Sequence, residues 1–533
     1  MMSGDSLLTE PFLQCPAADS VCVVWFTEFR GTKHEVVYGE NLLNRVIATT
    51  KKLTKMREDE QSRVYPSYRQ VTPRDIWRHK AKIENLKTDE HQPYRVISSD
   101  GERQIESDTY ILSPSPSPDR ALKILLTSDH QLMPMTAANL QKVVETVGQV
   151  DAVFHAGDLV NVPDRASEWF DDYRGGSFFP CLQGRAHYHL EKEGVTTVYK
   201  GGQIIQSSPL FTTIGNHEVM GRFDSYKPLN EQFNDAIPRH VARELAGDES
   251  IKDHSFNTDS YEEIFTLPRS PYYAVTFGNI RLVVLYVTQI WRLFFTTPDV
   301  KGRFQERFED LSHPGNWGYG QHIFEPISRG SEQYGWLQQE LASAEFKEAK
   351  YKIVMLHHPP HSLGGNVVPP FTDPVQNMSY DAQGKINGVT YNYPPENDYI
   401  VRDLLPLLEE SGVGLVYYGH CHLWNRFIGS NGTHYLESSN VGNTYGAFSG
   451  DKKRPVPEGS PYASVGDPNG LNAIVPNIAP LLNHDGQPLS YIASNDITVF
   501  SIFDTEKGIV SSYRYDTRYP DSAVIKFDEF YLQ

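Results

Sequence analysis

The feature that most constrains the fold of this chain is a repeated pairing of a short apolar run with a side chain of a metal-binding type. Each run is strand-like, and each ends in Asp, Asn or His. The five runs are ALKILLTSD (121–129), DAVFHAGD (151–158), PLFTTIGNH (209–217), YKIVMLH (351–357) and GVGLVYYGHCH (412–422). In open α/β sheets the functional site lies beyond the carboxyl ends of the strands. We therefore expect these five segments to converge at one edge of a sheet.

Helical patterns lie between the apolar runs. Helix-type periodicity is found at 136–148, 331–345 and 398–411, and the first of these stretches ends in a glycine. Alternating strands and helices are typical of a layered α/β domain. The last segments, DITVFSIFDTE, GIVSSYRYD and AVIKFDEFYL, return to a strand pattern.

The first part of the chain has a different pattern. Short strands rich in Val, Tyr and Trp follow one another from 8 to 112, which favours a β-sandwich. SPSPSPDR (113–120) is typical of a stiff, extended linker. We therefore predict an N-terminal domain over 1–112, this linker, and a catalytic domain over 121–533.

Three stretches of the predicted catalytic domain look like long loops, at about 300–330, 362–397 and 441–492. Loops of this length are often functional, and they also occur as surface insertions. Both interpretations stay open for each stretch, and the functional one makes them walls of a substrate pocket.

Charge and composition narrow the class of protein. Asp and Glu (67) exceed Lys and Arg (49), which gives a net charge of −18. Such an acidic surface argues against a nucleic-acid partner and against a polybasic membrane anchor. It remains compatible with a phosphate substrate, because bound cations can reverse the sign of the charge inside one cleft.

The lack of a visible targeting signal and the small number of cysteines bear on the cellular compartment of the protein. The first residues lack a basic start and an apolar core, and the longest apolar stretch, 280–291, is too short to cross a bilayer. The sequons at Asn377 and Asn431 are interpreted as chance matches. The four cysteines are too few for a disulfide framework in a chain of 533 residues. We expect a reduced, cytoplasmic setting without membrane association; the oligomeric state is not predictable.

The polar residues that end the apolar runs are metal ligands by type. They offer carboxylate and amide oxygens and imidazole nitrogens, and no thiolate, which favours Mn, Fe, Zn, Ni or Mg. This number of ligands suits two divalent ions, ~3.5–4 Å apart and bridged by one carboxylate. The candidates are Asp129, Asp158, Asn216, His357, His420 and His422.

The GHCH segment supports this arrangement. In extended backbone, residues two apart point to the same side, so His420 and His422 can serve one ion each, while Cys421 points away. Gly157, Gly215 and Gly419 each precede a candidate ligand and would allow a tight bend close to the ions.

The blocks DHQ, GDLVN, GNHE, HHPP and GHCH occur in this order, and the chain resembles the metallophosphoesterase (calcineurin-like) superfamily. More closely, it is similar to purple acid phosphatases, whose N-terminal fibronectin-type domain is matched by EPFLQCP, VVWFTE, VVYGE and HKAKIENL. The resemblance implies an N-terminal antiparallel, fibronectin-like β-sandwich followed by a four-layer α/β/β/α domain.

Carried over to this sequence, the resemblance implies roles for individual residues. Asp158 would bridge the two ions, with Asp129 and His422 on the first. The second ion would be held by Asn216, His357 and His420. His217 would be the general acid.

Two positions depart from the family pattern. The purple enzymes have a tyrosine three residues after the bridging Asp, where this chain has Asn161, so a purple Fe(III) centre is not expected. The third place of the first block is Gln131, where the family has His or Gly. An amide oxygen can ligate weakly, and a ligand role and a supporting role for Gln131 are equally open.

The resemblance implies a dinuclear phosphoric ester hydrolase in which a bridging hydroxide attacks the phosphorus of a small-molecule phosphomonoester or phosphodiester. His358 and His361 are rival proton donors, which we interpret with Asn161 as supporting or pocket-lining residues. For Arg426 a structural ion pair is preferred to a substrate contact. The alternatives are a cyclic-nucleotide or alkaline-type phosphodiesterase and, from another class, a non-catalytic scaffold with the same fold.

Overall fold

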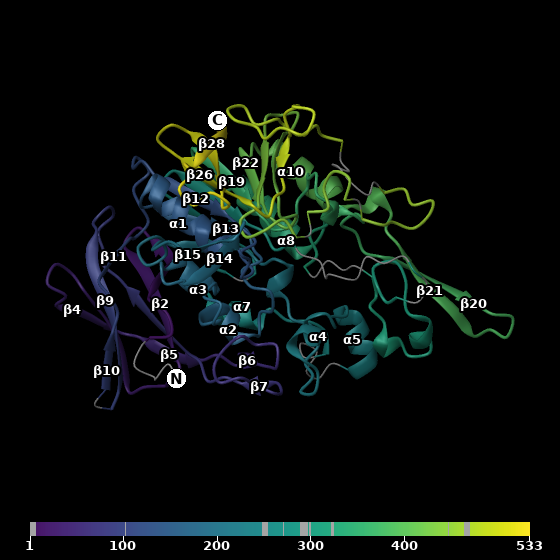
Figure 1. The fold of residues 1–533 in the computed structure, drawn as a ribbon, viewed down its shortest axis with the longest axis horizontal. Coiled ribbons are helices and arrows are strands. Elements are labelled where there is room, and N and C mark those ends of the chain that lie inside the picture. The colour runs from purple at the N-terminus through teal and green to yellow at the C-terminus, as the bar shows by residue number, and fades with distance from the viewer. Residues whose placement is uncertain are drawn as a thin grey trace.

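The computed structural model of the chain describes the residues 7–101, 103–247, 254–269, 271–287, 297, 300–320, 325–445, 447–452, 454–462 and 470–532. A β-rich N-terminal part lies beside a larger α/β part (Figure 1). Some of the sequence predictions concern residues outside these ranges, namely the first six residues, 288–291 of the apolar stretch, and 321–324, 446, 453 and 463–469 of the predicted loops.

The N-terminal part consists of two antiparallel sheets that face each other. Their strand orders are β1-β2-β8-β5 and β10-β9-β3-β4, with β11 paired to β9. Trp25, Ile83 and Val96 belong to the apolar core of this part. The strands are β1 (Phe12–Ala17), β2 (Ser20–Thr27), β3 (Lys33–Tyr38), β4 (Asn44–Ile47), β5 (Thr49–Lys52), β8 (Trp77–Ile83), β9 (Gln92–Asp100), β10 (Arg103–Glu106) and β11 (Tyr110–Leu112).

Strand β2 is buried along its whole length, which is unusual for a strand of an antiparallel sheet with one solvated face. Successive side chains of a strand point to opposite faces. Trp25 belongs to the N-terminal core, whereas the ring of Phe26 packs 5.1 Å from Phe170 and 5.5 Å from Phe179 in the α/β part. The N-terminal part is thus packed against the α/β part through an apolar interface.

Residues 113–120 join β11 to the α/β part and contain no helix or strand. The predicted domain boundaries at this linker stay predictions. Between β5 and β8, the short strands β6 (Arg57–Glu58) and β7 (Thr72–Pro73) form a separate pair. This pair lies beside α2 (Ala166–Phe170) and α4 (Leu229–Phe233) of the α/β part (Figure 1).

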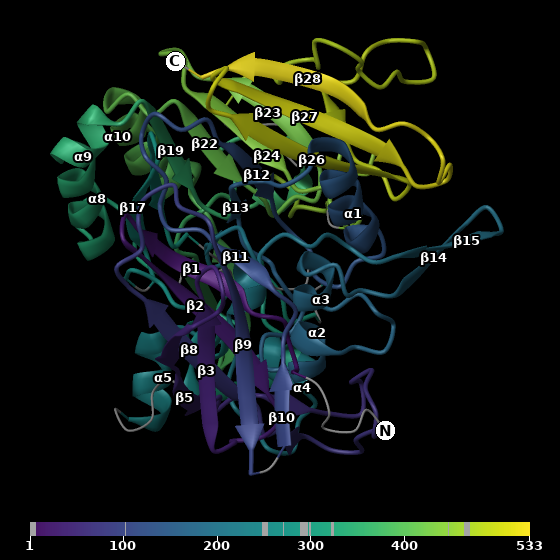
Figure 2. The same ribbon diagram turned by 90° about the vertical axis from the view of Figure 1, so that its left-hand side faces the viewer.

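The first sheet of the α/β part has the order β16-β13-β12-β26-β27-β28. Its first three strands are parallel, and the three C-terminal strands extend it in antiparallel fashion (Figure 2). The strands are β12 (Lys123–Thr127), β13 (Ala152–His155), β16 (Leu210–Thr212), β26 (Ile497–Asp504), β27 (Ile509–Asp516) and β28 (Ile525–Tyr531).

The second sheet has the order β17-β18-β19-β22-β24-β23-β25, and β18, β19, β22 and β24 run parallel. Its strands are β17 (Tyr273–Phe277), β18 (Ile280–Val284), β19 (Tyr351–Met355), β22 (Leu415–Tyr418), β23 (Trp424–Ile428), β24 (His434–Ser438) and β25 (Tyr491–Ile492).

The two sheets pack face to face, and helices cover their outer faces. Leu126 and Ile353 belong to the core between the sheets, and their chain neighbours Leu125 and Val354 to the cores under the helices. The first sheet is covered by α1 (Thr136–Val147), and the second by α8 (Glu332–Ala342), α9 (Ala344–Glu348) and α10 (Leu405–Glu410). These layers agree with the predicted α/β/β/α arrangement.

The three predicted helices are present with local changes. Ser343 divides the predicted helix at 331–345, because its hydroxyl accepts a bond from Phe346 N and starts α9. The helix at 398–411 begins as a π-helical turn, η6 (Ile400–Leu404), before α10, where Pro406 lacks the N–H of a regular turn.

Shorter elements complete the α/β part. The short helices are α2 (Ala166–Phe170), α3 (Phe178–Leu182), α4 (Leu229–Phe233), α5 (Arg239–Ala246) and α7 (Asp259–Ile264). The 3-10 turns are η1 (Asn216–Glu218), η2 (Phe308–Asp310), η3 (Pro314–Asn316), η4 (Gly365–Val367) and η5 (Pro395–Asn397). Two hairpins pair β14 (Tyr188–Lys192) with β15 (Val195–Tyr199), and β20 (Val375–Tyr380) with β21 (Ile386–Asn392).

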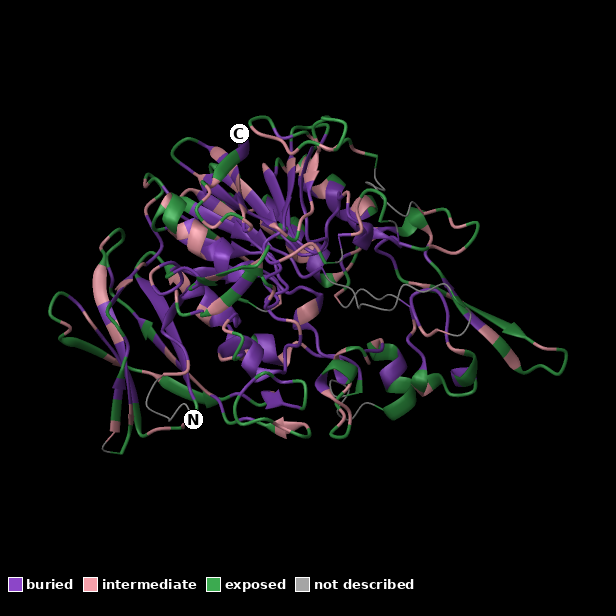
Figure 3. Cartoon of the chain, in the orientation of Figure 1, coloured by how far each residue is buried: buried purple, intermediate pink, exposed green. Residues whose placement is uncertain are grey.

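The hairpin β20–β21 corrects the prediction of a structureless loop at 362–397. It projects from the molecule, and most of its surface is exposed (Figures 1 and 3). Strand β20 has no buried face that would impose an apolar alternation on the sequence. Strand β21 does alternate, with Val389 and Tyr391 buried, and this signal was overlooked.

No helix in the described part of the chain has the length and apolar character needed to span a bilayer. The four cysteines are free thiols, in agreement with the prediction that they form no disulfide framework.

Candidate metal centre

The candidate ligands come together from both sheets of the α/β part. Asp129 and Asp158 follow β12 and β13, and Asn216 follows β16, all in the first sheet. His357 follows β19, and His420 follows β22, both in the second. The prediction of a single sheet edge is therefore corrected: the carboxyl ends of two facing sheets meet at one place.

The donor atoms form two groups. Within each group, one ligand atom per residue lies within 4.8 Å of the others, and every member is buried. The first group is Asp129, Asp158 and His422, and the second is His357, His358 and His420.

Asp158 connects the two groups. Its Oδ2 lies 3.2 Å from His357 Nε2 in the second group, while the residue belongs to the first. In the first group, His422 Nε2 lies 3.3 Å from Asp129 Oδ1. A carboxylate that reaches both groups is the type of ligand that can be shared by two cations.

Asn216 completes the second group. Its Oδ1 lies 2.9 Å from His420 Nδ1 and 3.2 Å from His357 Nε2, and the two ring nitrogens are 3.3 Å apart. His357 Nδ1 donates to the carbonyl of Ala156 at 2.7 Å, which directs Nε2 to the group. Oxygen and imidazole nitrogen atoms thus converge in a buried place, a donor set that fits divalent cations of the Mn, Fe, Zn, Ni or Mg type.

The ligand-bearing turns are strained. Asp129 (φ 54°), Asp158 (φ 56°), His420 (φ 84°) and His422 (φ 56°) all adopt the left-handed region, which is uncommon for residues other than glycine. Such clustering is characteristic of functional sites. The prediction of extended backbone at GHCH was therefore wrong, although His420 and His422 do serve different groups and Cys421 is buried in the apolar core.

All three predicted glycines are required by this geometry, and a Cβ on Gly215 would overlap the Asp158 side chain. Gly157 has φ 90°, and a Cβ there would meet His357 Nδ1 at 2.8 Å. A Cβ on Gly419 would overlap the side chains of Ser128 and Asp129. A residue without Cβ lets these turns approach the ligands.

Burial and neighbouring charges shift the pKa values of Asp158, His357 and His420. Burial disfavours the charged form of Asp158, but His357 and His217 hold the pKa of this carboxyl below its usual range. Burial by itself would lower the pKa of His357. The neighbouring Asp158 more than offsets this effect, so the pKa of His357 is raised to about 9. Burial and the neighbouring His358 and His357 keep the pKa of His420 well below normal.

Two buried glutamates that support the ligand turns were not identified from the sequence. The Glu218 carboxylate accepts bonds from the N–H groups of Asp158 (2.9 Å), Leu159 (2.7 Å) and Gly215 (2.7 Å). It is the last residue of GNHE, so its place in that block was the available signal. Glu437 accepts from Cys421 N at 2.7 Å, and no block of the sequence contains it.

His217 lies at the edge of the site and is partly buried. Its backbone N–H donates to Asp158 Oδ1 at 2.9 Å, and its Nδ1 donates to the carbonyl of Asn161 at 2.8 Å. Its ring stacks on Phe233 at 5.2 Å. Because Nδ1 is engaged, Nε2 is the nitrogen through which His217 can exchange a proton.

The two departures from the family pattern contact each other. Asn161 Nδ2 donates to the carbonyl of Gln131 at 2.6 Å. Gln131 is buried, and its Nε2 donates to Asp158 Oδ2 at 3.2 Å. Among the described residues, Gln131 Oε1 has no hydrogen-bond partner, although it is buried. A buried amide oxygen of this kind is costly unless something contacts it.

The remaining candidates, His358, His361 and Arg426, differ in whether they belong to a donor group. His358 lies in the second group, its ring centroid is 4.1 Å from that of His420, and its Nδ1 donates to Val287 O at 2.9 Å. His361 belongs to neither group, and its ring packs on Tyr435 at 4.6 Å. Arg426 forms a buried ion pair with Asp528 at 2.9 Å, as preferred from the sequence.

Two of the predicted loops contact ligands. Asn366, in the 362–397 stretch, donates from Nδ2 to His420 O at 3.1 Å. Asn443, in the 441–492 stretch, lies 3.0 Å from His422 Nδ1 through its Oδ1. Both stretches thus orient ligands, whichever part they also play in a pocket.

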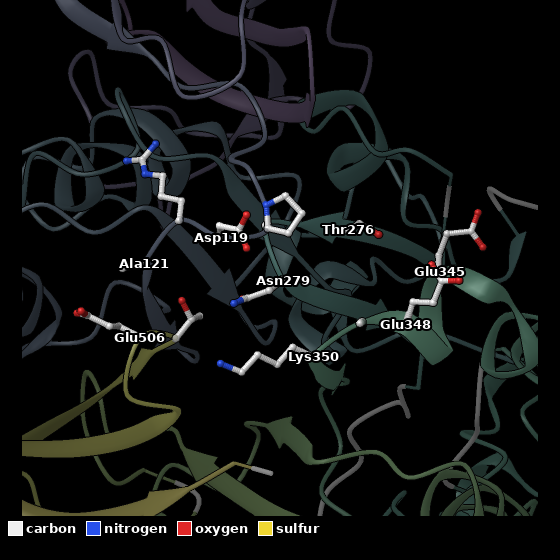
Figure 4. A pocket seen from close by; sticks show the side chains of 13 residues that line it. Asp119, Ala121, Thr276, Asn279, Glu345, Glu348, Lys350 and Glu506 are labelled. Carbon is white, nitrogen blue, oxygen red and sulfur yellow. The ribbon is translucent and has the colours of Figure 1, made fainter.

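A cavity of about 720 Å³ lies elsewhere, between the linker and the α/β part (Figure 4). Asp119, Asn279, Lys350 and Glu506 are among its lining residues. These residues lie near the starts of β12, β18 and β19, the opposite ends of the strands from the metal-binding groups. The cavity is therefore separate from the candidate centre.

Comparisons with known proteins give the family and the fold of the chain. A family model described as calcineurin-like phosphoesterase matches residues 122–423. Among solved structures, the purple acid phosphatase PPD1 isolated from yellow lupin (Lupinus luteus) seeds is similar in fold, with a TM-score of 0.56 and 14% identity. The match covers 97% of this chain and 73% of that chain. No similar sequence was found among curated proteins.

Proposed function

Because this chain belongs to the calcineurin-like phosphoesterase family, we propose that it is a hydrolase of phosphoric esters whose centre holds two divalent metal ions. The observation that carries the proposal is the pair of buried donor groups joined by Asp158. The family implies metal-dependent phosphoester hydrolysis, and the two groups favour two ions over one.

Each ion would have ligands of its own, and one carboxylate would be shared by both. Asp129 and His422 would hold the first, and Asp158 would be shared between them. The second would be held by Asn216, His357 and His420. The buried Oε1 of Gln131, which has no hydrogen-bond partner among the described residues, would be free to contact the first ion.

The ions would supply an activated water molecule and positive charge opposite the phosphoryl oxygens. The chain supplies the remaining functions. His217, anchored to Asp158 Oδ1 through its N–H and to Asn161 O through Nδ1, would protonate the departing oxygen from Nε2. Proton donation of this kind contributes ~10²–10⁴-fold to the rate.

The substrate class is a small-molecule phosphate ester. Monoesters and diesters are both compatible with the donor groups, and a cyclic-nucleotide or alkaline-type phosphodiesterase remains an alternative within the same chemistry. A non-catalytic scaffold is disfavoured because a protein that no longer needs ions would have no reason to keep buried, mutually facing ligands in strained turns.

The test is metal analysis of the purified protein, followed by hydrolysis of p-nitrophenyl phosphate, bis-p-nitrophenyl phosphate and cyclic AMP. The assay is repeated after chelation and after adding back Mn, Fe, Zn, Ni or Mg. We expect about two ions per chain and an activity that disappears and returns with the metal. A chain that binds metal at this centre but hydrolyses none of the three esters would support the scaffold.

A further inference from the structure

The segment 53–76 of the N-terminal part leaves its sheets and lies along the α/β part. Arg57 N donates to Asp164 O at 2.9 Å, and Arg57 forms an isolated bridge with Arg165. In Figure 1 the strands β6 and β7 of this segment lie next to α2 and α4. The N-terminal part therefore reaches the turns that follow the metal ligand Asp158.

Asp59 is one of the polar contacts of this segment with the α/β part, beside the ion pair of Arg74 with Asp171. Both of its carboxylate oxygens accept from Arg165 Nη2 at 3.1 Å, and Oδ2 also accepts from the backbone N–H of Leu229 at 2.8 Å. Only 1% of the Asp59 surface is exposed. A buried carboxylate with these partners holds two separate elements of the α/β part in a set position.

The first element leads from Arg165 to His217. Arg165 Nη1 donates to Glu168 Oε1 at 2.9 Å, and Glu168 Oε2 accepts from the N–H of Asn161 at 2.7 Å. The carbonyl of that same Asn161 accepts from His217 Nδ1 at 2.8 Å. Burial works against the charge of Arg165, but Glu168 and Asp59 together raise its pKa above the ordinary value, so the chain of contacts stays ionic.

The second element leads from Asp59 to the face of the His217 ring. Leu229, whose N–H is held by Asp59, begins α4, and Phe233 at the end of α4 stacks on His217 at 5.2 Å. Arg165 Nη2 also donates to Asn230 Oδ1 at 2.6 Å, which ties α4 to the first element.

We propose that Asp59 of the N-terminal part is a positioning residue for the proton donor His217, acting through Arg165 and Glu168 on one side and through α4 on the other. This inference rests on the proposed function, in which His217 gives its Nε2 proton to the leaving oxygen as the P–O bond breaks and water adds to phosphorus. The catalytic unit then includes the segment 53–76, and the N-terminal part has a role in the reaction.

The experiment compares esters that depend differently on the proton donor. p-Nitrophenolate leaves without help, whereas the poorer leaving group of phenyl phosphate needs the proton. For Asp59→Asn we expect kcat on phenyl phosphate to fall ~10–100-fold, because small misplacement of a catalytic group has such effects, with a much smaller loss on p-nitrophenyl phosphate. Arg165→Lys, which keeps the charge, should show the same selectivity in milder form.

Asp75→Asn is the matched control, because Asp75 lies in the same segment with a side chain that is 65% exposed. A second measurement needs no activity. In the metal-free protein, hydrogen exchange of the amides of Asn161, Val162 and Leu229 should become faster in Asp59→Asn and stay unchanged in Asp75→Asn.

The results separate the two proposals. If the metal-loaded wild type hydrolyses neither ester, the proposed function fails, and hydrogen exchange still reports on the contacts of Asp59. If the wild type is active but Asp59→Asn loses equal activity on both esters, or only in proportion to lost metal, the positioning role is wrong. Additive effects of Asp59→Asn and His217→Ala on phenyl phosphate would also overturn it. If Asp59→Asn does not fold, the same comparison on Arg165→Lys decides.

Discussion

Replacing Glu437 by glutamine tests how the turn that bears His420 and His422 is held. Glu437 lies on β24 with no exposed surface. Burial raises its pKa to about 8, and Asp129 adds to the effect, against the hydrogen bonds from Ser362 and Cys421. Glutamine has the same shape and cannot titrate, so Glu437→Gln isolates the proton.

The hydrogen bonds set the cost of the substitution. Oε1 accepts from Cys421 N at 2.7 Å, so the amide oxygen must take that place and the NH₂ group the place of Oε2. The Ser362 hydroxyl, 2.7 Å from Oε2, can reverse and accept, whereas Asn425 Nδ2 at 3.2 Å loses its acceptor. One lost bond to a buried donor costs about 1–3 kcal/mol of unfolding free energy.

The proton adds a dependence on pH. Between the ordinary pKa of 4.5 and the folded value of about 8, the folded wild type holds one more proton than the unfolded chain. Its stability therefore falls as the pH rises through this window, by about 1.4 kcal/mol per pH unit from this group alone. Glu437→Gln lacks this slope, so the stability advantage of the wild type should shrink from pH 5.5 to pH 7.5.

The assay is denaturant unfolding of the metal-free proteins at pH 5.5, 6.5 and 7.5, in which the unfolding free energy is measured for each. Glu84→Gln serves as the control, because Glu84 is 60% exposed and the variant should parallel the wild type. If the curves of the wild type and Glu437→Gln also run parallel, Glu437 is ionised in the folded protein and our account of the turn is wrong.

Three further outcomes are expected. Asp158→Asn should lose both ions and nearly all turnover, and full metal content with retained hydrolysis would refute its shared role. Because Asn161 stands where a tyrosinate would be needed, iron-loaded protein should lack a tyrosinate-to-iron band in its visible spectrum, and observing that band would contradict this assignment. Arg426→Met should lower stability by about 3–5 kcal/mol, because it leaves the buried Asp528 without its partner. Its kcat per folded molecule should be unchanged, and a fall in kcat at intact stability would instead indicate a substrate contact.

The layered α/β character and most of the candidate ligands could be predicted from the sequence, because both follow from local patterns, whereas the four-layer arrangement was implied by the family resemblance. Asp129, Asp158, Asn216 and His357 each stand where a buried strand ends, and the ends of parallel strands meet in space. The division of the strands between two sheets could not be predicted in this way. Pairing of β12 with β26 joins distant segments, and no local pattern records such a partner.

The supports of the ligands were harder to predict for a different reason. Glu218 and Glu437 accept hydrogen bonds from backbone N–H groups. Every residue except proline has such a donor, so no residue type in the sequence marks the partner. The left-handed residues His420 and His422 flank Cys421, whose N–H donates to Glu437. A pattern of residue types therefore predicts which side chains bind, and the backbone that presents them is visible only in the folded chain.

The place of β12 in its sheet has a consequence for biosynthesis. This strand is formed early on the ribosome, but one of its two neighbours, β26, is translated only after residue 496. The backbone of Leu122 likewise bonds to the hydroxyl of Thr505, 383 positions away. During synthesis, this side of β12 therefore stays unpaired until β26 (Ile497–Asp504) has emerged. Contacts so distant along the chain slow folding, and an unpaired strand edge is exposed to aggregation until its partner strand arrives.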